Sequence, residues 1–284
     1  MPANERNAVL ITGCSSGIGY TCAHGLAKRG YRVIASARRG EDVQRLIDEG
    51  LEAVRLDLDD SASIAEAVDS TFELTGGRLY ALFNNGAYGQ PGAVEDLTRD
   101  VLRAQLETNL LGWHDLTCRV IPVMRARGEG RIVQNSSVLG LVTLPYRGAY
   151  VASKFALEGL TDTLRLELAG SGIQVSLIEP GPILSRFRAN GHEKFRRNID
   201  GAHSVHKGKY AAAERRLLKD GPAQPFTLPP EAVLKKVIHA LESRRPKPRY
   251  YVTFPTFLFG TLRRVLTSRG MDRVLSRISS GGAR

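Results

Sequence analysis

The sequence has few cysteines, and their spacing predicts neither disulfides nor a metal centre. Cys14, Cys22 and Cys118 are the three cysteines among 284 residues, in apolar surroundings and without the paired spacing of zinc ligands. His203 and His206 have no acidic or thiolate set near them, so no metal site is predicted there. We therefore expect a reducing compartment, and the cytoplasm is the predicted location.

Long apolar runs are missing as well. The polar residues 1–7 lead directly into the apolar stretch 8–12, which leaves no room for a secretory signal. The longest apolar stretch of the tail, 250–262, is interrupted by Pro255 and Gly260 among others. It is shorter than the ~18 to 20 apolar residues that a membrane-spanning helix needs. No transmembrane segment is predicted.

Acidic residues are scarce in two late segments. The chain has 40 Lys and Arg against 29 Asp and Glu, a net charge of +11. Residues 244–284 carry ten basic side chains and one acidic one, residues 186–220 carry ten and four, and the remaining body is acidic. A nucleic-acid binder needs its positive charge over one face of the fold body, so no nucleic-acid partner is predicted.

The remaining composition indicates a globular α/β protein, with 42% hydrophobic and 24% charged residues. Short, nearly continuous apolar runs alternate with helical patterns, as in a parallel sheet covered on both faces. The predicted strands begin at residues 8, 32, 53, 80, 131, 174 and 249, and the predicted helices span 17–29, 41–49, 61–74, 99–126 and 149–169. We expect a Rossmann-type, doubly wound, seven-stranded and mainly parallel sheet, in one catalytic domain over residues 1–253.

A glycine-rich segment, 12–19, follows the first predicted strand and opens the first predicted helix. Glycines at this place let the backbone turn tightly and approach a pyrophosphate, whose charge the NH groups of the helix start attract. The spacing alone is weak, and a glycine turn that only packs helix on strand is the alternative. Its position between strand and helix favours a dinucleotide site.

The end of the second predicted strand lacks the acid that binds a ribose 2′-hydroxyl. Residues 37–39 read Ala-Arg-Arg, so nothing repels a 2′-phosphate, and the guanidinium of Arg38 can pair with it. We therefore predict NADP(H) rather than NAD(H); ordinary solvated arginines are the alternative. Asp57, beside Leu58, is expected either to accept from the adenine amino group or to cap the helix near Ser61.

Tyr150 and Lys154 lie four residues apart and so on one face of a predicted helix. A nearby ammonium favours the phenolate, so we expect Tyr150 to have a pKa below the reference of ~10. A solvated helix face is the alternative for so short a pattern. Ser137 ends the fifth predicted strand and is placed to bond the same substrate oxygen. Its neighbour Ser136 is the alternative, because only one of two consecutive strand residues faces the cleft.

Taken in order, these motifs resemble those of the short-chain dehydrogenase/reductase family: TGxxxGxG from Thr12, Asn84-Asn85, Asn109, Ser137, Tyr150-x-x-x-Lys154 and Pro180-Gly181. The resemblance covers about residues 7–253. The run YVASKFALEG from Tyr150 is similar to the hydroxysteroid and retinol dehydrogenase branch. GCSSGIG, GEGRIV, SLIEPGPI and the tail are similar to bacterial NADP-dependent aldehyde reductases of that branch.

The resemblance implies a role for each matching position. Tyr150 would exchange a proton with the substrate oxygen, Lys154 would hold the nicotinamide ribose, Ser137 would orient the substrate, and Asn109 would support Lys154 through a water. Two departures are Ser185, where the family usually has threonine, and Gly86-Ala87, which reverses the usual order. The expected cofactor-binding residues are Gly13, Ser15, Ser16, Gly17, Ile18, Gly19, Arg38, Asp57, Leu58, Asn85, Gly86, Tyr150, Lys154, Pro180, Gly181, Ile183 and Ser185.

Two segments follow the cofactor motifs. Residues 182–228 are expected to form a substrate loop or lid, with a surface loop free of substrate contact as the alternative. Residues 254–284 form a basic amphipathic extension of two short helices divided at Gly270. Its apolar stripe is expected to lie on anionic lipid at the inner membrane surface, to cover the cleft, or to pack on the body or a second subunit. The lid side chains expected to wall an apolar pocket are Phe187, Phe195, Tyr210, Leu217, Leu218 and Phe226.

Together these features predict an NADP(H)-dependent enzyme that reduces aldehydes or ketones of apolar substrates by hydride transfer, with Tyr150 as the general acid. A hydroxysteroid or retinol dehydrogenase on the same scaffold is the first alternative. A non-catalytic NADP(H)-sensing protein is the second, but it has no need for Ser137, Tyr150 and Lys154 together. The resemblance also suggests a homodimer or homotetramer with contacts through 99–126 and 149–169.

Overall fold

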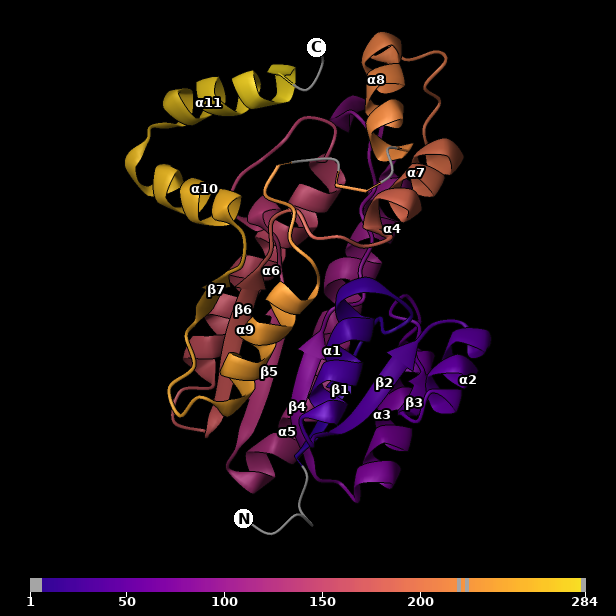
Figure 1. The fold of residues 1–284 in the computed structure, drawn as a ribbon, viewed down its shortest axis with the longest axis vertical. Coiled ribbons are helices and arrows are strands. Elements are labelled where there is room, and N and C mark those ends of the chain that lie inside the picture. The colour runs from indigo at the N-terminus through magenta and orange to yellow at the C-terminus, as the bar shows by residue number, and fades with distance from the viewer. Residues whose placement is uncertain (1–6, 219–220, 223–224, 282–284) are drawn as a thin grey trace.

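Seven strands form one parallel sheet in the computed structural model, in the order β3-β2-β1-β4-β5-β6-β7 (Figure 1). The structure describes residues 7–218, 221–222 and 225–281, so parts of the expected lid and the end of the tail lie outside the described residues. All seven predicted strands are confirmed: β1 (Ala8–Ile11), β2 (Arg32–Ala37), β3 (Glu52–Arg55), β4 (Leu79–Asn84), β5 (Gly130–Asn135), β6 (Ile173–Glu179) and β7 (Arg249–Tyr251).

Helices cover both faces of the sheet, which confirms the doubly wound fold. They are α1 (Gly17–Lys28), α2 (Gly40–Asp48), α3 (Ser61–Thr75), α4 (Arg99–Leu106), α5 (Gly112–Arg127), α6 (Gly148–Glu167) and α9 (Glu231–Glu242). One apolar core joins α1 and α9 to the strands, and a second joins α3, α5 and α6 to the opposite face. Because β1, β4 and β6 are buried almost throughout, they read as continuous rather than alternating apolar runs.

Three details differ from the sequence-based expectations. The predicted helix 99–126 is divided by a π-helical turn, η2 (Glu107–Leu111). Helix α9 was not predicted. The tail forms α10 (Phe254–Val265) and α11 (Ser268–Gly281), so the division at Gly270 is wrong. Leu266 adopts an extended conformation that ends α10, and the hydroxyl of Thr267 accepts the amide of Gly270 inside α11 at 3.3 Å.

The lid and the tail stand beyond the carboxyl ends of the strands (Figure 1). The lid contains α7 (Phe187–Asn198) and α8 (Lys207–Leu218), and the short 3-10 turns η1 (Val94–Asp96) and η3 (Val138–Gly140) lie in the loops after β4 and β5. Among the described residues, no helix combines the length and hydropathy needed to cross a bilayer. Ligands of open α/β sheets bind at this carboxyl edge, where the connections that follow the neighbouring strands β1 and β4 lead to opposite faces of the sheet.

Candidate active site

The turn after β1 requires glycine at two positions. Gly13 has a φ of 71°, and a Cβ atom there would lie 2.5 Å from the Cα of Gly86. A Cβ atom on Gly19 would lie 2.2 Å from the carbonyl oxygen of Gly13. The hydroxyl of Thr12 accepts the backbone amides of Asn85 and Gly86, both at 2.8 Å, and so ties this turn to the end of β4. The backbone therefore forms a bare, rigid surface before α1.

The start of α1 faces the root of the lid. A Cβ atom on Gly17, whose φ is 61°, would lie 3.0 Å from the Cβ atom of Ser185. Cys14 lies within the turn, and its thiol donates to the carbonyl of Ile11 at 3.2 Å. Burial raises the pKa of Cys14 to about 12, so its thiol stays protonated and the residue serves as a small filler.

The residues expected around an adenosine lie at the ends of β2 and β3. Arg38 is exposed directly after β2. The carboxylate of Asp57 accepts the amide of Asp59 at 3.2 Å. Capping of α3 by Asp57 is wrong, because Asp60 is the N-cap and accepts a first-turn amide at 2.9 Å. Leu58 is buried, with its Cδ1 atom 3.2 Å from the position of a Cβ on Gly86.

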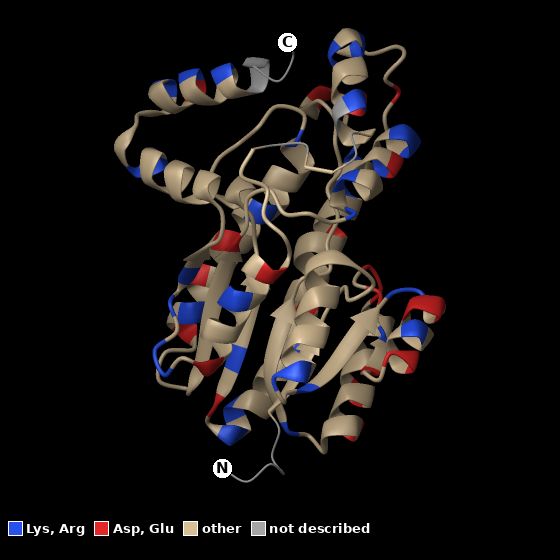
Figure 2. Ribbon diagram, viewed as in Figure 1, with Lys and Arg blue, Asp and Glu red and all other residues tan. Residues whose placement is uncertain are grey.

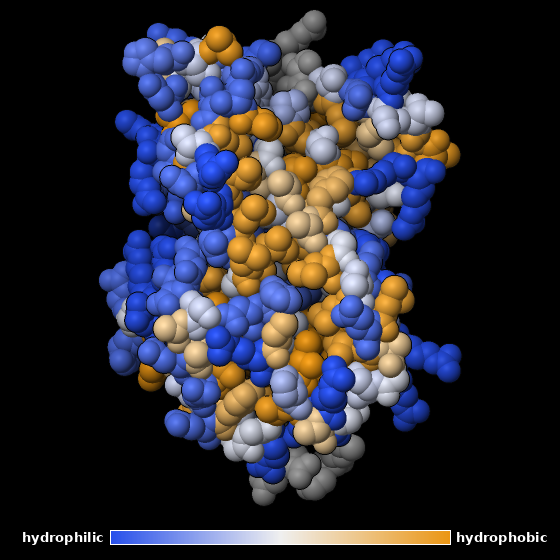
Figure 3. All heavy atoms as spheres, turned by 180° about the vertical axis from the view of Figure 1, so that it is seen from behind, coloured by the Kyte–Doolittle hydropathy of each residue, from blue (hydrophilic) through white to orange (hydrophobic). Residues whose placement is uncertain are grey.

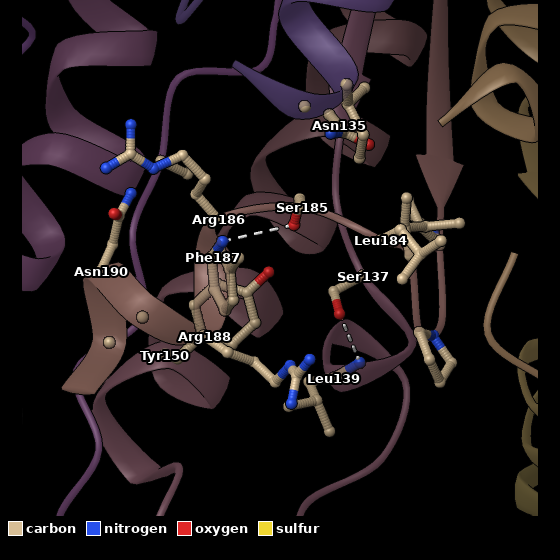
Figure 4. Close-up of a pocket in the computed structure, with 18 of the residues that line it drawn as sticks. Asn135, Ser137, Leu139, Tyr150, Leu184, Ser185, Arg186, Phe187, Arg188 and Asn190 are labelled. Atoms are coloured by element: carbon tan, nitrogen blue, oxygen red, sulfur yellow. Dashed lines mark hydrogen bonds between the residues drawn. The ribbon is translucent and has the colours of Figure 1, made fainter. Parts of the chain in front are cut away.

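Ser137, Tyr150 and Lys154 line one cavity at the same edge of the sheet. Figure 4 shows Ser137 and Tyr150 there. Tyr150 is in the first turn of α6, and Lys154 follows one turn later on the same face. The ammonium of Lys154 donates to the backbone carbonyl of Asn135 at 2.8 Å and lies 4.2 Å from the ring centroid of Trp113. It lies 5.7 Å from the ring centroid of Tyr150. The one-face placement predicted from the spacing is therefore observed.

Burial dominates the titration of this site. Burial raises the pKa of Tyr150 to about 12, although hydrogen bonding with Ser137 opposes the rise. Burial also lowers the pKa of Lys154 to about 7, and the carboxylate of Glu158 opposes that fall. The expected lowering of the phenol pKa is therefore wrong for this state, because desolvation outweighs an ammonium that itself loses charge near neutral pH. A phenol with a raised pKa keeps its proton and remains a donor.

Ser137 rather than Ser136 faces Tyr150. The hydroxyl of Ser136 is directed towards the carboxyl of Glu158, and its proximity lowers the pKa of that carboxyl, against its burial. A Cβ atom on Gly140 would lie 2.8 Å from the Ser136 hydroxyl oxygen, which places this side chain beneath η3. The two serines thus point to opposite sides, as alternation along an extended segment requires.

Asn109 lies in the π-helical turn and is fully buried. Its amide donates to the carbonyl of Tyr88 at 2.8 Å, and its side-chain oxygen accepts the amide of Tyr88 at 3.2 Å. The same amide lies 3.3 Å from the hydroxyl of Ser153 on α6. Asn109 therefore fixes the loop after β4 against α6; support of Lys154 through a water stays a prediction. Single π turns are frequent at functional sites.

Asn135 is a site residue that the sequence-based prediction missed. Its carbonyl holds Lys154, and its side-chain amide donates to the side-chain oxygen of Asn85 at 2.9 Å. It thereby links the end of β5 to the end of β4. Asn135 could have been predicted as a site residue from its position directly before the two serines.

A cavity of about 370 Å³ lies between the glycine turn, the ends of β4 and β5, the start of α6 and the lid. It is lined by all three of Ser137, Tyr150 and Lys154. Of the remaining expected cofactor residues, Gly19, Arg38, Asp57 and Leu58 do not line it, and these do: Gly13, Ser15, Ser16, Gly17, Ile18, Asn85, Gly86, Pro180, Gly181, Ile183 and Ser185.

The lid contributes fewer apolar walls than expected. Phe187 and Leu217 line the cavity, and the ring of Phe187 lies 5.3 Å from that of Tyr150 between centroids (Figure 4). Phe195 and Tyr210 pack instead in the lid's own core. Leu218 and Phe226 are exposed. Because α7 and α8 pack on each other and on the loop after β4, the apolar side chains on their inner faces are buried in that contact and do not reach the cavity. His203 and His206 pair with Asp200 and Glu95.

Comparison with known proteins agrees with this geometry. The family model of the short chain dehydrogenases matches residues 7–195. The oxidoreductase YbbO of Escherichia coli (strain K12) is 43% identical over 270 residues, covering 95% of this chain and 94% of that protein. Human 17-beta-hydroxysteroid dehydrogenase type 1 is 34% identical over 263 residues, covering 87% and 78%.

A solved structure extends the similarity to the fold. The short chain dehydrogenase/reductase from Burkholderia phymatum in complex with NAD has a TM-score of 0.75 and 25% sequence identity, covering 93% of this chain and 94% of that one. Sequence motifs, sheet order and the grouping of Ser137, Tyr150 and Lys154 all agree with these matches. The chain belongs to the short-chain dehydrogenase/reductase family of oxidoreductases.

Proposed function

We propose that this protein is an NADP(H)-dependent reductase of aldehydes or ketones that carry apolar groups. One observation supports this above the others. A glycine turn suited to a pyrophosphate and the trio Ser137, Tyr150 and Lys154 open on one cavity. A cofactor held by the turn would therefore lie beside a protonated phenol.

The residues present fit a nicotinamide dinucleotide. Gly13 and Gly17 have positive φ angles and leave bare the surface that side chains would otherwise fill, at the N-terminal end of α1. Arg38 supports the phosphorylated form, because an exposed cation stands where NAD-binding sites carry an acid. The Burkholderia phymatum relative is in complex with NAD, so NAD(H) is the competing choice.

The proposed mechanism uses each member of the trio once. When bound, the nicotinamide supplies the hydride that reduces the carbonyl carbon. Tyr150 donates its phenolic proton to the carbonyl oxygen, and the hydroxyl of Ser137 orients that oxygen. The ammonium of Lys154, held by the carbonyl of Asn135 at 2.8 Å, stabilises the phenolate left behind. In the oxidative direction Tyr150 takes the hydroxyl proton back.

The cavity walls favour apolar substrates. Leu139, Leu144, Leu184, Phe187 and Leu217 line it on the side of the lid and of η3. Similarity to human 17-beta-hydroxysteroid dehydrogenase type 1 favours a hydroxysteroid dehydrogenase as the second candidate. Retinal belongs in the same test, because the sequence resembles that branch as well.

The decisive experiment measures NADPH oxidation with aldehydes, ketones, steroids and retinal, for the native enzyme and for Tyr150→Phe. Loss of the proton donor should lower kcat by about 10² to 10⁴-fold. Tyr31→Phe is the matched control, because Tyr31 lies outside the cavity beside Glu242. Full activity in a folded Tyr150→Phe enzyme would refute the mechanism, and turnover of steroids alone would favour the second candidate.

Subunit contacts through α4 to α6 are part of the proposal. Leu111, at the end of η2, and Leu160, on α6, are large apolar residues that stay exposed. Their burial by a second copy would support the homodimer or homotetramer that the family resemblance suggests. Light scattering after size-exclusion chromatography measures the mass, and a monomer at micromolar concentration contradicts this part.

A further inference from the structure

Four helices beyond the sheet carry almost all of the chain's net charge. We call α7, α8, α10 and α11 together the crest. The crest has thirteen Lys and Arg against three Asp and Glu, which leaves twenty-seven against twenty-six in the rest of the chain. Figure 2 shows these basic residues along the upper rim of the molecule. The positive charge of the protein is therefore concentrated at one end.

An exposed apolar stripe runs along α10 within this basic rim. Phe254, Phe257, Leu258 and Val265 are between 39% and 73% exposed, and their spacing puts them on one face of the helix. The other face of α10 is used for packing, because a Cβ atom on Gly260 would lie 2.6 Å from the ring of Tyr251. The stripe is thus a second, exposed face, although the ring of Phe257 also lies 5.4 Å from that of Tyr251 between centroids.

The stripe is continuous with the mouth of the active-site cavity. The ring of Phe254 lies 4.9 Å from that of Phe226 between centroids, and Phe226 is itself 56% exposed. Thr227, the next residue, lines the cavity. In the reverse view of Figure 3, hydrophilic residues crowd both upper corners and apolar side chains occupy the surface between them. Apolar side chains therefore lead from α10 through Phe226 to the residue that lines the cavity.

Cations lie next to the stripe. Arg264 follows on α10, and Arg269, Arg273 and Arg277 are on α11. All four are exposed. Within the residues that the structure describes, none of them forms an ion pair with a carboxylate of the chain. Met271 and Leu275 point α11 inward against Val142, so these guanidinium groups remain available on the outer side.

We propose that the crest docks on the surface of a bilayer that contains anionic lipids, with the α10 stripe in the interfacial layer and the arginines at the headgroups. Apolar and basic surfaces side by side are typical of helices that lie in a membrane interface. A nucleic acid would use the charge but leave the aromatic stripe in water. A second crest would bring like charges together, which opposes self-association. Docking also turns the cavity mouth towards the lipid, from which apolar substrates can enter.

Flotation with vesicles tests the docking independently of any reaction. The full-length protein should float with vesicles that contain phosphatidylglycerol and stay behind with pure phosphatidylcholine, and high salt should release it. Phe257→Ser with Leu258→Ser, and separately Arg269→Glu with Arg273→Glu, should each lower vesicle affinity by about tenfold or more. Matched controls far from the crest, Ile47→Ser and Arg78→Glu with Arg125→Glu, should bind like the native chain.

Other occupants give different results. No flotation at low salt overturns the proposal. The proposal is also overturned if the serine double variant floats like the native protein and a DNA duplex binds equally well. The crest is then a general binding site for polyanions. A dimer that the serine double variant abolishes assigns the stripe to a second copy instead. An unchanged melting temperature of each variant shows that lost binding is not lost folding. None of these outcomes depends on the proposed reductase activity.

Discussion

Arg249 ties the edge strand β7 to α6, the helix that carries Tyr150 and Lys154. Its guanidinium donates to Glu179 at 2.7 Å, to Asp162 at 2.5 Å and also to Glu158. Glu179 is fully buried, and Glu158, on α6, is nearly so. Burial raises the pKa of both glutamates, and Arg249 opposes the rise. Three carboxylates thus share one guanidinium, and Asp162 also pairs with Arg165.

Replacing Arg249 with Met should destabilise the fold strongly. Removing one partner of a buried ion pair costs about 3 to 5 kcal/mol, because the other charge stays buried and unpaired. Part of this cost is avoided because burial raises the pKa of Glu179 to about 8, so that this carboxyl is already largely protonated at neutral pH. We therefore expect about 3 kcal/mol at neutral pH, and a melting temperature lower by roughly 6 to 12 °C.

The sign of the pH dependence follows from the raised pKa of Glu179. A carboxyl whose pKa is higher in the folded state favours folding only while it is protonated, so this contribution fades as the pH rises from its unfolded value towards about 8. Without Arg249 the ionised form is still less tolerated. Both proteins keep this carboxyl protonated well below pH 8, so the deficit of Arg249→Met against the native protein should stay level there and grow as the pH rises through about 8.

Urea unfolding at several pH values measures this deficit. Arg165→Met is the matched control, because its ion pair with Asp162 at 2.6 Å is partly exposed and should be worth less than about 1 kcal/mol. Adding Glu179→Gln to Arg249→Met should restore part of the lost stability. A deficit no larger than that of the control, or one that shrinks with rising pH, would refute the reasoning.

Three further predictions concern the site itself. Lys154→Met should abolish activity but raise the free energy of unfolding by roughly 2 to 4 kcal/mol at and below pH 7, because burial lowers the pKa of Lys154 to about 7. This gain in stability should fade as the pH rises towards 10. Urea unfolding across this pH range measures the gain, and a loss of stability contradicts the prediction. Gly13→Ala should lower the free energy of unfolding by about 2 kcal/mol or more and abolish the change in NADPH fluorescence on binding. Gly30→Ala is the control, because Gly30 has a φ of 97° but no atom within 4 Å of the new Cβ. It should lose only the part of the stability that comes from the strained backbone conformation. Arg38→Asp should lower kcat/KM for NADPH about tenfold to hundredfold and favour NADH, while Arg39→Asp, whose partner is Glu41 at 3.3 Å, should change little; an unchanged preference in Arg38→Asp would show that Arg38 is a solvated charge.

Local patterns predicted the framework well, since each strand and its following turn are encoded within a few residues. Helix α9 shows a signal that was present and missed: Val233, Val237, Ala240 and Leu241 repeat at helical spacing and are all buried. The break in the tail could not be located from Gly270, because glycine is tolerated inside a helix that packs well. Leu266 ends α10 through its backbone conformation instead.

The sequence by itself determined the seven strands in their order along the chain, the bare turn at Gly13 and the shared face of Tyr150 and Lys154, because periodicity and spacing are local properties of the chain. Only the tertiary structure decided that burial raises the pKa of Tyr150, that Asn135 holds Lys154, and that most apolar side chains of the lid turn away from the cavity. Desolvation and packing depend on residues distant in the chain, so no local pattern contains them.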